Sequence, residues 1–220
     1  MGYSRRAASM CALLAVSSLS CSVKGNTEEA PILPATKVCN SLFPEPVARQ
    51  LEALAGIRRF TEYSKQGVES FSSRLQKIKG SPQGQEEQEV CRLITEVDDG
   101  RKERRLIVAV SFWWSESELA KPHPEITKQA KSGKLTQYSL GTRSEARDNG
   151  AAIYFRCSPR GAVKDTTVLS GNLWTANTKL TGQAGRNARI TILNAAARKI
   201  ARQLDCLDTA NLPETFHKAT

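Results

Sequence analysis

The sequence is poor in the side chains and motifs that most often carry catalysis. Only two histidines occur among its 220 residues: His123 stands between prolines and His217 lies near the C-terminus. The chain has no Gly-x-Gly-x-x-Gly, P-loop, Gly-x-Ser-x-Gly or His-Glu-x-x-His pattern. We therefore assign no catalytic residue and predict no cofactor, although two carboxylates from distant parts of the chain could still act together.

The cysteines are not spaced for a metal. No Cys-x-x-Cys pair occurs, and only the two histidines could join the cysteines as ligands. We expect no metal site.

A long apolar run is missing as well, because no stretch reaches the roughly 20 residues that cross a bilayer. The chain opens instead with the layout of a bacterial export signal. Arg5 and Arg6 form a basic start, residues 10–19 are mostly apolar, and small residues precede Cys21. We predict a signal peptide over residues 1–20 that is removed from the mature protein.

Cys21 resembles the cysteine of the bacterial lipobox, which is lipidated and becomes the new N-terminus. Ser20 fits the position before it, whereas Ser18 and Leu19 depart from the usual pattern, and ordinary cleavage also fits these residues. Cysteine parity favours lipidation, because a free Cys21 would leave an odd number of thiols in an oxidising compartment. The expected location is extracytoplasmic, with a lipid at Cys21 anchoring the protein to the membrane; secretion is the alternative.

Charge narrows the expected partners. Loss of Arg5 and Arg6 with the signal lowers the formal net charge from +10 to +8. In a compartment without chromosomal DNA, a basic surface favours the membrane, an anionic envelope polymer or another envelope protein over nucleic acid. The same charge can also simply maintain solubility.

The mature chain divides into a spacer, a domain and a tail. Residues 21–37 are polar, contain two prolines and read as a flexible spacer, and residues 208–220 as a fraying tail. Between them, residues 38–207 predict one α+β domain, an antiparallel sheet with two main helices packed on it. The apolar periodicity predicts helices over residues 44–55 and about 190–204, and strands over 89–97, 104–114, 151–157 and 163–176. Residues 57–65 have no clean period and residues 70–78 fit a strand or a helix; we assign both as strands. Residues 80–88 and 115–149 read as surface excursions.

The strand over residues 104–114 is central in this prediction. Val108, Phe112 and Trp114 share one face with other apolar residues, because side chains alternate across a strand. Trp113 then lies on the opposite face, and the same alternation places Tyr154 and Arg156 there too. We interpret these three residues as a candidate binding surface, and the alternative is that a helix covers that face.

The four remaining cysteines allow three pairings, and sequence alone cannot choose among them. The layout favours Cys39 with Cys91 and Cys157 with Cys206, because each pair would tie a helix to the sheet. The separations of 52 and 49 residues predict a stabilisation of about 4 kcal/mol per disulfide in the chain-entropy model.

The segments Val38-Cys39-Asn40-Ser41-Leu42-Phe43-Pro44 and Arg198-Lys-Ile-Ala-Arg-Gln-Leu-Asp-Cys206 bracket the domain. In this arrangement the chain resembles small actinobacterial lipoproteins of unknown function. The resemblance implies an exported, membrane-tethered α+β domain and carries over no catalytic residue. We expect a non-enzymatic binding or accessory role at the cell surface, with an envelope enzyme acting on wall or lipid material as the alternative.

Overall fold

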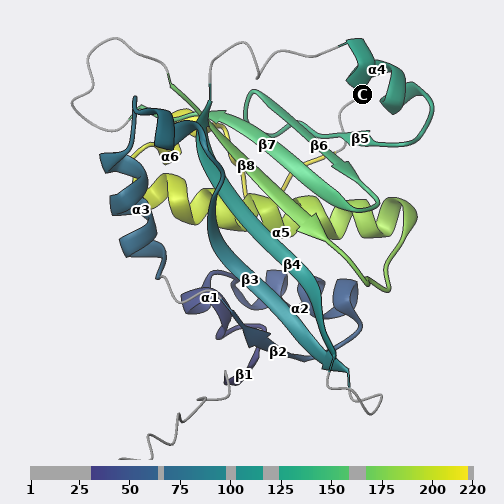
Figure 1. Ribbon diagram of the computed structural model, residues 1–220. Helices are drawn as coiled ribbons and strands as arrows, with labels where there is room; N and C mark the ends of the chain where they lie inside the picture. Colours follow the sequence, from purple (N-terminus) through teal and green to yellow (C-terminus); the bar gives the residue numbers. More distant parts are fainter. Residues whose placement is uncertain (1–30, 64–66, 98–102, 116–123, 159–166, 218–220) are drawn as a thin grey trace, which may run out of the picture.

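The computed structural model describes residues 31–63, 67–97, 103–115, 124–158 and 167–217. The predicted signal peptide, Cys21 and residues 98–101, where Asp99-Gly100 between two apolar runs predicts a hairpin turn, lie outside these ranges. Its centre is an eight-stranded antiparallel sheet in the order β1-β2-β3-β4-β8-β7-β6-β5 (Figure 1). The strands are β1 (Ile32–Pro34), β2 (Arg59–Glu62), β3 (Gln88–Val97), β4 (Glu103–Ser115), β5 (Thr136–Gln137), β6 (Arg143–Arg147), β7 (Gly150–Arg156) and β8 (Val168–Thr175).

The helices form a second layer. They are α1 (Val38–Ser41), α2 (Glu45–Ala55), α3 (Val68–Lys77), α4 (Pro124–Lys131), α5 (Gly182–Gln203) and α6 (Leu207–Ala210), with a 3-10 turn, η1 (Pro82–Gln85). Figure 1 shows α5 and α2 behind the sheet, where they pack on each other and α5 contacts β6, β7 and β8. The predicted α+β class, antiparallel sheet and pair of main helices are confirmed.

The stripe predicted for the last helix is its buried side. Ile190, Leu193 and Ile200 are fully buried in the core between α5 and the sheet. Arg189 lies outside the apolar periodicity of this helix, which predicts a solvated side chain, but this prediction is wrong, since only 1% of the residue is exposed. Its Nε donates to the Thr175 hydroxyl at 2.8 Å and its Nη2 to the Thr178 hydroxyl at 2.7 Å.

Both predicted disulfides are present, Cys39 with Cys91 and Cys157 with Cys206. The first joins α1 to β3, and the second joins the residue after β7 to the residue before α6. Disulfides of this kind persist in oxidising compartments, which indicates an extracytoplasmic location. Among the described residues, none of the helices combines the length and apolar character needed to span a membrane.

Two internal segments differ from the prediction. Residues 70–78 were expected as a strand, but all of them except the last belong to helix α3, whose buried residues Val68, Phe71, Ser72 and Leu75 recur at helical spacing. The expected irregular region 115–149 contains α4, β5 and β6. The polar sequences of β5 and β6 carry no strand signal, and pairing of β5 with β6 and of β6 with β7 supplies their order.

The surface loop at residues 80–88 and the two ends are also more ordered than expected. Gly84 is buried, and a side chain added there would collide with the Ile78 carbonyl and contact Trp114 closely. β1 lies inside the predicted spacer and pairs with β2. The predicted tail forms α6, and Phe216 beyond it packs edge-on against Tyr138 with ring centroids 5.8 Å apart.

Candidate functional site

The sheet has one face covered by helices and one open face. Val108, Val110 and Phe112 of β4 are fully buried on the covered face, where α3 contributes Phe71, which packs against Phe112. The open face carries the alternate residues of β4, β8, β7 and β6. The described helices α1, α2, α3, α5 and α6 pack on the covered side, and α4, which has no buried residue, lies near β5 at one edge (Figure 1).

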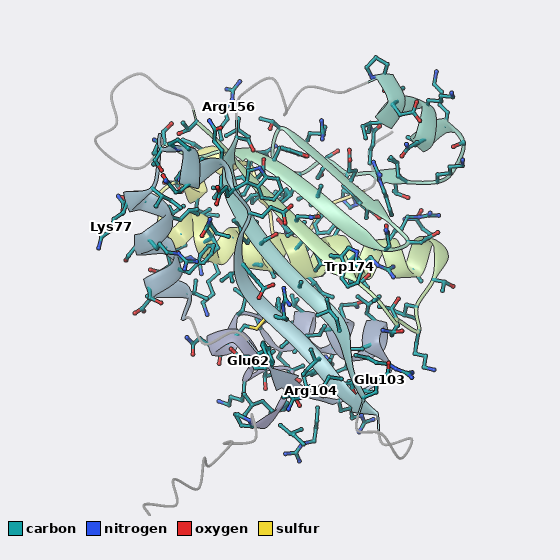
Figure 2. All side chains as sticks on the ribbon, in the orientation of Figure 1. Glu62, Lys77, Glu103, Arg104, Arg156 and Trp174 are labelled. Atoms are coloured by element: carbon teal, nitrogen blue, oxygen red, sulfur yellow. A yellow bond between two sulfur atoms is a disulfide. The ribbon has the colours of Figure 1, made fainter. Side chains whose placement is uncertain are left out.

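Strand register brings the predicted surface residues together on the open face. Trp113 lies opposite Ser170, Ser170 opposite Tyr154, and Tyr154 opposite Arg143. Directly opposite residues of antiparallel strands point to the same side, so these residues form one row across four strands. Arg156 shares the face but stands at the end of β7, and Figure 2 shows it well apart from Trp174. Among the described residues, no helix covers this row, so they do not form the alternative arrangement.

A shallow hollow of about 280 Å³ lies on this face. Its principal walls are three aromatic side chains and three polar ones: Trp113, Tyr154, Trp174, Glu145, Arg147 and Asn172. Trp174 is 44% exposed and projects from the sheet where Figure 2 labels it. Arg156, one of the predicted residues, does not line the hollow, whereas Trp113 and Tyr154 do.

Glu145 is the buried acid of the hollow, with only 5% of the residue exposed. Its carboxylate lies 3.5 Å from Arg143 Nε and 3.6 Å from Arg147 Nη2, both longer than a good hydrogen bond. Among the described residues, no donor forms a hydrogen bond to its Oε2 atom. Burial raises the pKa of Glu145, and the charges of Arg143 and Arg147 oppose that rise only in part.

Arg143 also fixes the neighbouring aromatic ring. Its guanidinium lies over the Tyr154 ring, 4.0 Å from the centroid, which is a favourable cation–π distance. Burial raises the pKa of the Tyr154 hydroxyl, so this group stays protonated and available as a donor or acceptor. One arginine therefore orders both Tyr154 and the acid beside it.

Other large apolar side chains are exposed on the same face. Ile32 is 52% exposed and Tyr63 is 57% exposed. Ile32 lies opposite Thr61 at the β1–β2 end of the sheet. The backbone N–H of Tyr63 donates to the carbonyl of Arg92, and Ala109 lies opposite both Arg92 and Trp174, which places Tyr63 in one row with Trp174. Water-exposed apolar groups thus gather on the side of the sheet that the helices leave open.

Sequence reasoning missed Trp174 and Glu145. The signal for Trp174 was present, because Leu169 and Leu173 point inward and the alternation sends Trp174 outward. Glu145 had no such signal, since β6 reads Arg-Ser-Glu-Ala-Arg and only its neighbours in the sheet bury it.

Another hollow, about 620 Å³, lies between the start of α2 and the side of α5. Two basic residues in its lining, Arg198 and Lys199, form hydrogen bonds to neighbouring segments of the chain. Lys199 Nζ donates to the carbonyls of Asn40 and Ser41 at 3.0 and 2.9 Å, and Arg198 bonds the Leu212 carbonyl and Glu214. These contacts give the basic side of α5 a structural use.

Among the described residues, no three metal-ligating side chains lie close enough together to hold an ion. The chain matches no protein-family model, no curated protein and no solved structure.

Proposed function

We propose that this protein is an exported, lipid-anchored binding protein whose open sheet face binds a component of the cell envelope. Its role is accessory rather than enzymatic. The observation that carries the proposal is the meeting of Trp113, Tyr154 and Trp174 around one hollow on the face that the described helices leave uncovered. Exposed aromatic side chains supply large contact area at recognition surfaces.

The shape of the hollow favours binding over catalysis. Its volume of about 280 Å³ is at the lower limit of ordinary small-molecule sites. The carboxylate in its lining is Glu145, whereas an acid–base pair of the kind that hydrolyses glycosides requires a second acid nearby. The lining thus offers contact area and hydrogen bonds without an evident pair of proton-transfer groups.

The anchor rests on the leader and on the cysteines. With four cysteines paired in two disulfides, Cys21 is the thiol left over in the predicted mature chain. Lipidation at Cys21 would hold the domain at the membrane, close to envelope polymers. Fractionation tests this part: the intact protein is expected in the membrane fraction, and Cys21→Ser should abolish the mass of the lipid and release the protein or block its processing.

Cosedimentation with isolated envelopes of the producing cells tests the binding face. The variant Trp113→Ala/Trp174→Ala should lose most of its binding, because both residues wall the hollow. Tyr63→Ala is the matched control, since it removes an exposed aromatic residue from the same face outside the hollow. Equal binding by all three proteins would overturn the proposed function.

A further inference from the structure

We infer that the hollow on the open face binds one uncharged sugar ring of an envelope glycan, with ring hydroxyls donating to Glu145 and the apolar side of the ring lying on Trp174. This inference rests on the proposed function and names its ligand. Three features of the hollow support it: a buried hydrogen-bond acceptor, aromatic walls and a small volume.

The acceptor comes first. A carboxylate that is buried normally receives several hydrogen bonds, because leaving it without donors is costly. Glu145 lines the hollow, is almost fully buried, and its nearest cations stand at 3.5 and 3.6 Å. Arg147 is 43% exposed in its side chain, so it can yield to an entering ligand. A hydroxyl group is the small neutral donor that this carboxylate lacks.

The walls supply the complementary apolar contact. A pyranose ring carries hydroxyls around its edge and C–H groups on its faces, so it needs a polar partner and a flat apolar one. Trp113 and Trp174 provide indole surfaces beside the polar groups Asn172 and Arg147. Tyr154, held under Arg143, adds a hydroxyl that can both donate and accept.

Size and charge limit the occupant. A hollow of about 280 Å³ accommodates one ring, and the rest of a polymer would extend from it into the solvent. The lining holds one acid and one base, Glu145 and Arg147, whose opposite charges balance, so the hollow has no net charge to attract an ionic unit. An uncharged sugar unit matches this balance and can still donate hydroxyl hydrogen bonds to Glu145.

The test uses oligosaccharides released from the producing cells' own envelopes and separated by ion exchange into uncharged and charged pools. The protein is recovered after export and titrated with each pool by tryptophan fluorescence. Trp113 and Trp174 report on the hollow, whereas Trp114, 4% exposed on the covered side, gives a constant background. We expect saturable binding of the uncharged pool and little binding of the charged pool.

The variants locate that binding. Trp174→Ala and Glu145→Gln should each weaken it by about tenfold or more, since each removes a central contact. Tyr63→Ala and Glu103→Gln, which change an aromatic residue and an exposed acid outside the hollow, should stay within about twofold. Because Glu145 is buried, thermal melting and disulfide mapping confirm that its variant is folded, and Trp174→Ala at an exposed position gives an independent reading.

The outcomes separate this inference from the proposed function. Binding of the charged pool alone, or binding that Trp174→Ala leaves unchanged, overturns the sugar assignment. If neither pool binds but envelopes still capture the protein through Trp113 and Trp174, the binding face stands and its ligand is a protein or lipid instead. If envelopes capture the original protein and all variants equally, the proposed function itself fails.

Discussion

Adjacent tryptophans on one strand show how differently the two faces of the sheet are used. Trp114 points to the helices, is 4% exposed, and its indole N–H donates to the Leu75 carbonyl of α3 at 2.7 Å. Trp113 points to the open face and walls the hollow. The residue type is the same and the backbone is continuous, so strand alternation alone decides which indole stabilises the fold and which is available to a ligand.

The sharpest way to break this comparison is to remove each indole in turn. Trp114→Ala should lower the free energy of unfolding by about 3 to 5 kcal/mol, because it opens a cavity and leaves the Leu75 carbonyl without its donor. Trp113→Ala should cost about 1 kcal/mol or less and instead reduce envelope binding. Chemical denaturation of both variants, followed by cosedimentation of the folded ones, measures the two effects. Similar losses of stability would mean that the open face is also core.

The next largest effect concerns the two disulfides, which lie on the covered side of the sheet. Cys91 and Cys157 are fully buried, and the two disulfides join residues that are 52 and 49 positions apart in the sequence. Replacing Cys157 and Cys206 together by alanine should cost about 2 to 5 kcal/mol.

The position of that loss sharpens the comparison. Hydrogen exchange should increase most in α5, α6 and the end of β7, which this disulfide holds together. A loss of protection from exchange that is confined to the β1–β2 end of the sheet would contradict this prediction, because the disulfide nearest to that end is Cys39–Cys91.

The covered face was far easier to predict from sequence than the open one. Strong apolar alternation in β4 and a helical stripe in α5 encode burial directly, and the cysteine layout followed from those elements. β6 has no such pattern, because Ser144 and Ala146 are buried by their neighbours rather than by their own hydrophobicity. Alternation could therefore place Trp113 and Tyr154 on the face of the hollow, but it could not find Glu145, which depends on a strand that only tertiary pairing creates.

A second adjacent pair, on β8, gives a smaller test. Gly171 faces the covered side, where an added Cβ would come within 2.5 Å of the Phe112 ring and 3.0 Å of Ile153. Gly171→Ala should therefore cost about 1 to 3 kcal/mol by overpacking. Asn172→Ala, one residue on and facing the hollow, should change stability by about 0.5 kcal/mol or less. Denaturant midpoints compare the two, and a costlier Asn172→Ala would reverse the assignment of faces.

The smallest expected effect is a pH dependence on the open face. Burial raises the pKa of Glu145 above its ordinary value of 4.5, so the folded state holds this proton more tightly than the unfolded state. The contribution of Glu145 to stability is therefore greatest below that value and is lost as the pH rises through the folded pKa. Glu145→Gln removes the titration. Its stability relative to the original protein should rise as the pH increases from about 4.5 toward neutral, because only the original protein loses a stabilising proton. Denaturation across this range measures the difference, with Glu103→Gln subtracting the change in net charge. A relative stability that falls toward neutral pH would mean that Arg143 and Arg147 outweigh burial, and that Glu145 already has the partners that a sugar hydroxyl is proposed to supply.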